Sequence, residues 1–526
     1  GANGNLTISG GTQVLSGANT YSGTTIISAN ATLTLGAAGT IPDASALTIN
    51  GTLDLASFSE TIGTLAGSGT LTNSVATTVS TLTTGTAAST TFAGTLQNGS
   101  GTIALVKIGS GTLTLSGANT YTGGTTISAG TLALGNNNVL ADTGAITIDG
   151  STAALSIGAY SDTVAAVTLS AGSITGTGGT LTGSSYGITN STGTTSISAI
   201  LGGTGIALSK SGAGTLTLSG INTYTGSTTI SAGILAVSLD SNLGTAPSGA
   251  NSGSIVLNGG TLKITETLLM SSTRGISMSA NGSIAVDENK TLTYNGIISG
   301  SGNLTKAGNG TLVLGGDSTM SGTTSINAGT LQIGNGGTSG SLGSGPVINS
   351  SILAYSRSDD VILSGDLSGV GSIAQSGTGT LFLTGTNSYS GATYINSGTL
   401  SVGSGGLTGT LGTGAVTNNA SLVINRDGLI SVANVISGTG SLTKSGAGTL
   451  TLSGINTYTG STTISAGTLA LSTAGAIANS SGVANSGTFD ISGVTSSASI
   501  ITLSGAGGVN IAGKTLTITN GSTTYS

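Results

Sequence analysis

The sequence predicts an all-β fold of the β-solenoid class, in which similar turns of chain stack along one axis. A long phrase, Gly109–Gly135, recurs along the chain, and the stretch Ser211–Gly233 returns unchanged as Ser445–Gly467. Self-similarity of this kind is typical of stacked repeat units and not of a single globular core. Within the phrase, Thr-Leu-Thr-Leu alternates polar and apolar side chains with period two, as half-buried strands do.

The composition also favours ordered β-structure. Gly accounts for 94 of 526 residues, but Leu, Ile, Val and Thr are abundant and Pro occurs only 3 times. Disordered segments are instead poor in β-branched residues and rich in charge or proline. No 3.6-residue periodicity and no capping box predicts a helix. The high glycine content therefore indicates many turns between short strands.

A tyrosine, replaced once by methionine, marks each copy of the phrase. The markers are Tyr21, Tyr121, Tyr224, Met320, Tyr389, Tyr458 and Tyr525, so the first three units are long and the last three are short. The spacings fit three turns in the short units and four or five in the long ones, at roughly 20–25 residues per turn. We expect one continuous β-solenoid over residues 1–526, with marked units around 1–36, 105–135, 206–237, 302–334, 373–403 and 440–471 and a partial unit at 513–526. At about 4.8 Å per turn it would be roughly 100–130 Å long.

The recurrent residues have expected structural roles. Apolar strand residues should point inward and stack in ladders, as in the set Leu113, Leu115, Ile127, Leu132 and Leu134. Asparagines two residues before the markers could bond successive backbones as an internal or turn ladder; they are Asn119, Asn222, Asn387 and Asn456. The marker tyrosines are expected to cover a corner of the solenoid, with stacking on carbohydrate as the alternative.

Four lysines precede the Gly-x-Gly of the phrase at a fixed offset: Lys107, Lys210, Lys306 and Lys444. The copies are too far apart for these charges to act together beyond a Debye length. We therefore expect solvated turn residues and not a cationic stripe for a polyanion.

The composition excludes several function classes. The chain has no Cys and no His, so it cannot build a Cys-based metal site or a Ser-His-Asp triad from its own residues. With 10 Lys and Arg side chains and a net charge of −6, it lacks the clustered cations of a nucleic-acid-binding protein. No apolar run approaches the roughly 20 residues of a transmembrane helix, so we expect no membrane insertion by this segment.

One small charged cluster is the best candidate for a surface site. It contains Arg357, Asp359, Asp360 and Asp366. A polysaccharide-cleaving β-helix needs two or three convergent acids, but adjacent acids on a strand face opposite sides. We interpret the cluster as solvated edge charges, and we expect no catalytic site, no cofactor and no metal. Thr-x-Thr pairs such as Thr112/Thr114 suit the outer face of a sheet, and ice binding is a less favoured interpretation.

The phrase G-x-G-T-L-x-L-x-G-x-N-x-Y-x-G-x-T-x-I-x-x-G-x-L resembles the passenger-associated transport repeat of autotransporter passengers in Gram-negative bacteria. Six copies reach from near the start to Leu471, and Gly310–Gly334 departs most, with Ser318 and Met320 in the Asn and Tyr positions. The resemblance implies a right-handed parallel β-helix displayed or released outside the outer membrane. It also implies that the repeat is associated with export and folding of the passenger.

The leading functional prediction is an extracellular structural or surface β-solenoid, an autotransporter-like passenger or fibre subunit, that serves display, adhesion or matrix formation without catalysis. The alternatives are a polysaccharide-cleaving enzyme near Arg357–Asp366 and an ice- or glycan-binding adhesin module. Both ends of the chain lie within repeat-like sequence. Because uncapped terminal turns expose unpaired backbone groups, we expect end-to-end self-association. Other surface or matrix components and glycans are further expected partners, and nucleic acid is not.

Overall fold

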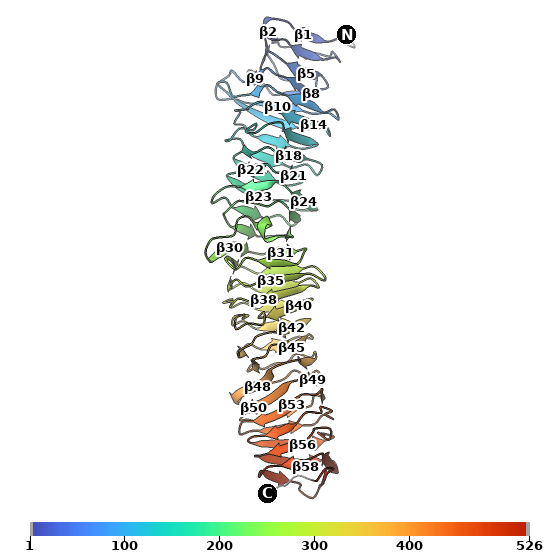
Figure 1. The fold of residues 1–526 in the computed structure, drawn as a ribbon. Helices are drawn as coiled ribbons and strands as arrows, with labels where there is room; N and C mark the ends of the chain where they lie inside the picture. The colour runs from blue at the N-terminus through green and yellow to red at the C-terminus, as the bar shows by residue number, and fades with distance from the viewer. Residues whose placement is uncertain (1–3, 522–526) are drawn as a thin grey trace. The chain divides into compact units, whose positions relative to one another are not determined.

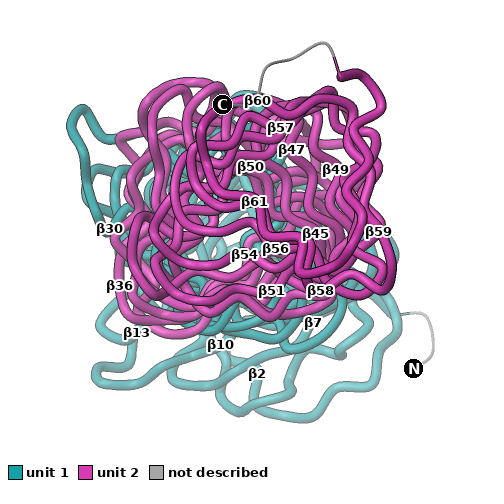
Figure 2. The backbone as a smooth tube through the Cα atoms, turned by 90° about the horizontal axis from the view of Figure 1, so that it is seen from below, with its two compact units in different colours: residues 1–263 teal, residues 264–526 magenta. Residues whose placement is uncertain are grey.

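The chain folds almost wholly into short parallel β-strands. The computed structural model describes residues 4–521 (Figure 1). The chain divides into two compact units, residues 1–263 and 264–526, which are coloured separately in Figure 2. Among residues 4–521 the one helical element is a 3-10 turn, η1 (Asp240–Leu243). The predicted all-β parallel solenoid is confirmed, with about 26 turns. The expectation that one solenoid runs unbroken through the chain stays a prediction.

In unit 1 the backbone winds in superposed turns (Figure 2), and strands in successive turns pair into ladders. One ladder contains β1 (Leu6–Ile8), β3 (Thr25–Ile27), β5 (Ala46–Ile49), β8 (Thr64–Gly67), β11 (Thr90–Phe92), β14 (Thr112–Leu115), β16 (Thr131–Leu134), β18 (Ala154–Gly158), β21 (Ser173–Gly176), β24 (Thr194–Ile197), β27 (Thr215–Leu218) and β29 (Ile234–Val237). A second contains β7 (Glu60–Ile62), β10 (Val79–Thr84), β13 (Thr102–Lys107), β15 (Thr125–Ile127), β17 (Ile146–Ile148), β20 (Ala166–Leu169), β23 (Ser185–Ile188), β26 (Leu208–Lys210), β28 (Thr228–Ile230) and β30 (Asn251–Leu257). Two shorter ladders are β2 (Gly11–Leu15), β4 (Ala31–Leu35), β6 (Thr52–Asp54), β9 (Thr70–Thr72) and β12 (Thr95–Leu96), and β19 (Asp162–Thr163), β22 (Thr180–Thr182) and β25 (Ile200–Gly202).

Unit 2 has three faces, each built from successive ladders. The first face contains β34 (Gly282–Val286), β37 (Leu304–Ala307), β39 (Thr324–Ile326), β41 (Val347–Asn349) and β44 (Leu367–Ser368), then β51 (Ile430–Val432), β54 (Thr449–Leu452), β56 (Thr468–Thr473), β58 (Thr488–Val494) and β61 (Gly508–Asn510). The second contains β32 (Leu268–Met270), β35 (Thr291–Tyr294), β38 (Thr311–Leu314), β40 (Thr330–Ile333), β42 (Ile352–Tyr355), β45 (Ser372–Gln375), β47 (Thr393–Ile395), β49 (Val416–Asn418) and β52 (Ile436–Ser437), then β59 (Ser497–Ile500) and β62 (Thr515–Ile518). The third contains β33 (Arg274–Met278) and β36 (Ile298–Gly300), then β43 (Val361–Leu363), β46 (Thr380–Leu383), β48 (Thr399–Gly406), β50 (Ser421–Arg426), β53 (Ser441–Ser445), β55 (Thr462–Ile464), β57 (Val483–Asn485) and β60 (Leu503–Ser504).

Each marked copy of unit 2 interrupts one of these ladders. The backbone N–H groups of Thr319, Ser388 and Thr457 donate to Ile298, Leu367 and Ile436, so the marker segments still follow the last strand before each break. The chain then passes the same face once more without forming a strand, and the ladder resumes at β43, β51 and β59. A marker is therefore the start of a local irregularity in an otherwise regular stack.

The register of the ladders gives the length of a turn. Lys107 aligns through Ile127, Ile148, Leu169 and Ile188 with Lys210, so five turns separate the two lysines, as the sequence predicts for the long units. The turn is thus about 21 residues long.

The short units are longer than the three whole turns that their spacing predicts. Leu312 aligns through Leu331 and Leu353 with Ile373, so three turns end at Ile373 and do not reach the next copy's equivalent of Leu312, which is Leu381. The remaining segment, 374–381, carries the chain to Leu381 in a different ladder. A short unit is therefore three turns and about one third of a turn.

The core consists of inward apolar ladders. Leu113, Leu115, Ile127, Leu132 and Leu134 are all between 0% and 5% exposed, as expected from the alternation. At roughly 25 cal/mol per Å² of apolar area removed from water, their burial is the main stabilising term. The outward residues of the same strands are half-buried threonine and alanine, which suit a pleated surface.

Candidate functional site

The four lysines of the phrase are core residues. Their side chains are 0% or 1% exposed, and each ammonium group lies among backbone carbonyls. Lys107 Nζ donates to Ile108, Gly109 and Ala129 at 2.6, 2.8 and 3.1 Å. The prediction that these lysines are solvated turn residues is wrong, because each sits in the inward phase of its strand, as Leu105 and Lys107 of β13 do.

The same carbonyl cradle recurs at the other three lysines. Lys306 Nζ donates to Ala307, Gly308 and Ala328 at 2.9, 2.8 and 3.0 Å. Lys444 donates to Ser445, Gly446 and Ala466, and Lys210 to Gly212 and Ala232. Burial lowers the pKa of all four ammonium groups, that of Lys306 to about 8. Buried charge is tolerated only where hydrogen bonds compensate for lost hydration, which the carbonyls provide here.

One copy replaces the lysine with two neutral donors. Gln375 is 2% exposed, and its Nε2 donates to Gly377 at 3.1 Å and Gly379 at 2.9 Å. In this copy the alanine of the cradle is Ser397, whose hydroxyl donates to Ser376 at 2.6 Å and Gly377 at 3.0 Å. The lysine copies all have alanine there: Ala129, Ala232, Ala328 and Ala466. Glutamine and serine together thus supply the donors that one ammonium group supplies elsewhere.

The marker tyrosines are buried inside the break that they begin. Tyr121, Tyr224, Tyr389 and Tyr458 are 0% or 1% exposed, so their rings cannot stack on a carbohydrate in solution. Each hydroxyl bonds the hydroxyl of the threonine four residues later, as Tyr389 does with Thr393 at 2.7 Å. Met320 is 0% exposed in the same position, Tyr21 is half-buried, and Tyr525 lies outside the described residues.

The marker asparagines join three consecutive turns. Asn387 Oδ1 accepts from the N–H of Leu367 at 3.0 Å, and its Nδ2 donates to Thr410 at 2.8 Å. Asn456 does the same between Ile436 and Ala476, both at 3.0 Å. Asn119 and Asn222 follow this pattern, and Ser318 occupies the position in the copy around Met320. These amides replace strand pairing where the ladder is broken.

Two buried acids in unit 1 were not identified from the sequence. Glu60 and Asp162 are each 2% exposed and accept backbone N–H groups of the preceding turn. Thr40 donates to Glu60 at 3.0 Å, and Val139 donates to Asp162 at 2.8 Å. Desolvation raises the pKa of both carboxyl groups, and one oxygen of each is buried without a partner among the described residues. Each acid lies two residues before an inward apolar residue, Glu60 before Ile62 and Asp162 before Val164. This period-two spacing is the sequence signal that could have identified both acids as buried.

The charged cluster proposed from the sequence does not converge on one point. Arg357 forms a bidentate ion pair with Asp359, in which Nε donates to Oδ1 at 2.8 Å and an Nη donates to Oδ2 at 2.7 Å. This hydrogen bonding holds the pKa of the Asp359 carboxyl below its usual value. The same guanidinium donates to the carbonyls of Gly340 and Thr338. Asp360 and Asp366 instead accept backbone N–H groups of the next turn, those of Thr380 and Thr386. The cluster fixes a loop and two turns.

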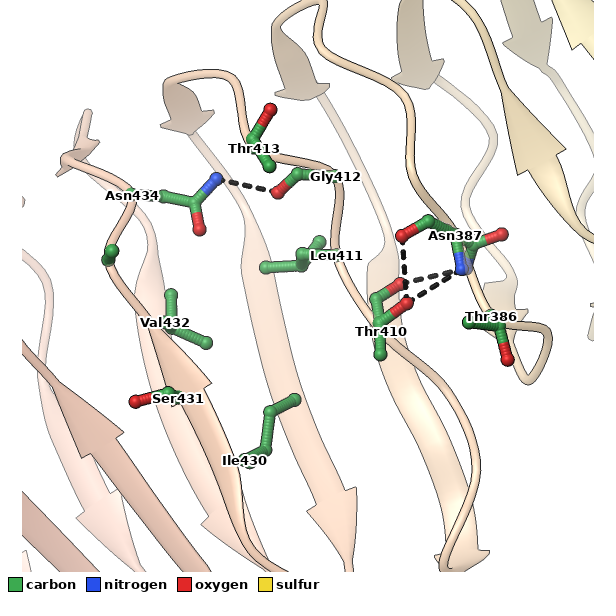
Figure 3. Close-up of a pocket in the computed structure, with 11 residues that line it drawn as sticks. Thr386, Asn387, Thr410, Leu411, Gly412, Thr413, Ile430, Ser431, Val432 and Asn434 are labelled. Carbon is green, nitrogen blue, oxygen red and sulfur yellow. Dashed lines mark hydrogen bonds between the residues drawn. The ribbon is translucent and has the colours of Figure 1, made fainter.

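A recess lies beside the ladder break of the copy around Tyr389 (Figure 3). It has a volume of about 350 Å³ and is lined by Thr386, Asn387, Thr410–Thr413 and Ile430–Asn434. Asn434 Nδ2 donates to the carbonyls of Gly412 and Gly414 at 2.8 and 2.5 Å. The lining residues, all of them described, include no charged side chain.

Neither a metal-binding cluster nor a membrane-crossing helix is found among the described residues. Across residues 4–521 no three Asp, Glu, His or Cys side chains come together as a metal site. The described residues also contain no helix of the length and apolarity that crossing a membrane requires.

The fold and its recurrent residues define a class: a parallel β-solenoid in which buried lysine, asparagine and tyrosine side chains recur in most copies of the repeat. Six stretches match the passenger-associated transport repeat, at residues 8–35, 105–134, 208–237, 304–333, 373–402 and 442–471. A curated relative is the "Adhesin BmaC autotransporter" of Brucella suis biovar 1 (strain 1330), 36% identical over 246 residues. The match covers 47% of this chain and 7% of that relative, and no solved structure matches the chain. The chain therefore contains six passenger-associated transport repeats and is similar, over part of its length, to an autotransporter adhesin.

Proposed function

We propose that this β-solenoid acts outside the cell as an adhesive segment of an autotransporter passenger. The observation that carries the proposal is the combination of six passenger-associated transport repeats with a relative named as an adhesin. The site geometry supports a role in contact and not in catalysis, because the recurrent polar residues bond the chain's own backbone. The acids of the Arg357 cluster are likewise engaged with turns of the solenoid.

The distribution of charge limits the classes of partner that the solenoid can bind. Five of the ten Lys and Arg side chains are buried, namely the four cradle lysines and Arg274, whereas only two of the sixteen acids are. The exterior is therefore poorer in cations than the net charge of −6 suggests. Binding of a polyanion needs cationic side chains at the surface, so proteins and neutral glycans are favoured over nucleic acid.

The test is attachment of beads that carry the purified chain to host-cell monolayers and to abiotic surfaces. We expect attachment above that of beads coated with an unrelated protein of similar charge, and no loss after Asp360→Asn. Attachment equal to that control would contradict the adhesive role. Release of sugar from a glycan panel, abolished by Asp360→Asn, would replace it with the polysaccharide-cleaving alternative.

A surface location is part of the same proposal. In cells that express the full-length protein, antibody against unit 2 should label intact cells, and external protease should remove the label. Labelling that requires permeabilised cells would overturn this location.

A further inference from the structure

The break beside Tyr389 leaves a strand edge unpaired. On the first face of unit 2 the ladder stops at β44 and resumes at β51. Between them the chain passes at residues 387–389 and 410–413, and the second passage forms no ladder with β51. Its carbonyls bond side chains instead, since Asn434 reaches Gly412 and Gly414. The β51 edge that faces residues 410–413 thus lacks a backbone partner strand.

The alternation along β51 shows which groups lie on this edge. Ile430 and Val432 align with Leu450 and Leu452, and the N–H of Ser453 donates to Val432. In a parallel ladder, alternate residues direct their N–H and C=O groups to opposite sides. The backbone groups of Ser431 therefore face the recess. Among the described residues, no backbone group of the preceding turn bonds the Ser431 N–H.

The recess over this edge carries no charged side chain, and the part of its lining next to β51 is apolar. Leu411, Ile430 and Val432 line it at 9%, 7% and 2% exposure, and Figure 3 shows these side chains between the passage at 410–413 and β51. Leu429, next to the edge, is 81% exposed, and Leu407, from the loop beside Gly428, is 71% exposed. Exposed leucines next to an open strand edge favour a partner with apolar side chains.

We propose that this recess is a docking site for an extended, uncharged peptide segment of a partner protein, which pairs with β51. Backbone groups of the peptide meet the N–H and C=O of Ser431, and an apolar side chain packs on Leu407 and Leu429. This is strand addition to an exposed sheet edge, in which main-chain bonds supply affinity and flanking pockets supply specificity. A glycan fits less well, because the lining offers no exposed aromatic ring for a sugar to stack on.

The proposal names a kind of partner for the adhesive role and in that sense rests on it. The peptide site is tested on the purified chain, so it can fail while attachment to cells stands. Conversely, a chain that binds peptides without attaching to cells would overturn the adhesive role alone.

The probe is a library of short random peptides displayed on phage, selected on the full chain and counter-selected on Ser431→Pro. Proline removes the N–H of residue 431 but leaves the bonds of Ile430 and Val432 to β54, and proline is tolerated at strand edges. Ser431→Ala keeps the N–H and is the matched control. We expect apolar, uncharged peptides that bind the Ser431→Ala variant as they bind the parent and bind Ser431→Pro at least about tenfold more weakly.

Two further measurements keep the proposal falsifiable. Hydrogen exchange of β54 in Ser431→Pro must match the parent, which shows that the ladder below has survived. If β54 is perturbed, Leu429→Asp replaces Ser431→Pro, and the same loss is expected. N-methylation of alternate peptide residues should abolish binding in one phase and spare it in the other. Selection of no peptide that prefers the parent, or equal tolerance of both methylation phases, refutes strand addition.

Discussion

The exchange of lysine for glutamine and serine in one copy predicts a coupled pair of substitutions in another. Lys444 Nζ donates to Ser445 and Gly446, both at 2.7 Å, and to Ala466 at 3.4 Å. By analogy with Gln375, Lys444→Gln would reach the carbonyl of Gly446 and leave that of Ser445 without a donor. A buried carbonyl without a donor costs about 1–3 kcal/mol.

The companion substitution Ala466→Ser should restore the missing donor. Ser397 donates to the equivalent carbonyl, that of Ser376, at 2.6 Å. We therefore expect Lys444→Gln to destabilise the surrounding turns by about 1–3 kcal/mol. Ala466→Ser alone should be close to neutral. The double variant should recover about 1–2 kcal/mol of that loss as a coupling energy.

The assay is native-state hydrogen exchange of β53 and β55, which reports the free energy of opening of these turns and not of the whole chain. Lys444→Gln combined with Ala232→Ser is the matched control, because Ala232 belongs to the cradle of Lys210 and cannot reach Ser445. Its effects should be additive. A coupling below about 0.5 kcal/mol for the true pair, or an equal coupling for the control, would show that the cradle does not act as described.

Four further predictions concern single positions. Burial lowers the pKa of Lys306 to about 8 from 10.5, so between these pH values the folded state binds fewer protons than the unfolded state, and the stability of the surrounding turns should rise with pH. In Lys306→Met this pH dependence should vanish, and an unchanged pH dependence would show that another group causes it. The folded-state pKa of Glu60 is raised above its usual value of 4.5, so the stability that Glu60 contributes is complete below pH 4.5 and is lost as the pH rises through the folded-state pKa. Urea titrations of Glu60→Gln should lack this loss of stability, and a variant with the same pH dependence as the parent would disprove the role of Glu60. Asn456→Ala leaves the Ile436 N–H without an acceptor and removes one of the two donors to the Ala476 carbonyl, which keeps the backbone N–H of residue 456. It should cost about 1–3 kcal/mol by hydrogen exchange, and a cost as small as that of an exposed asparagine would argue against the bridge. Leu450→Asp places a charge at a site that is 0% exposed and should open the local turns by several kcal/mol, so unchanged amide protection there would contradict the assigned core.

The alternation of side chains predicted most of the fold. The period-two pattern of Leu113 and Leu115 indicated inward ladders, and both residues are buried. The same pattern held the signal for the lysines, since Lys107 follows Leu105 in the inward phase. It was overlooked because a lone lysine is usually solvated, and only the three-dimensional closure of the corner brings the carbonyl of Ala129 within reach.

Other features could not be predicted from the chain. The recess at Ser431 depends on how far the passage at 410–413 departs from the stack, which no local propensity specifies. The length of a turn was predicted only as roughly 20–25 residues, because the spacing between Met320 and Tyr389 does not show that the unit contains a fraction of a turn. The register of Leu312 with Ile373 resolves this, and it does so through pairing between residues distant in sequence.

The fractional turn in each short unit sets the direction in which a copy is displayed. In unit 2 the cradle residues Lys306, Gln375 and Lys444 lie on β37, β45 and β53, one on each face. A surface feature that recurs with each copy therefore lies on a different face of the solenoid in successive copies. Partners can thus approach the copies from three sides.

In unit 1 the stretch from Lys107 to Lys210 makes five whole turns, which returns the copy to the same face about 24 Å further on at the usual strand spacing. Insertion or deletion of about one third of a turn between copies, roughly 7 residues, would therefore convert a row of equivalent sites on one face into a spiral of sites around the axis, without altering any site. Spacer length in such a chain is a control over valency and orientation.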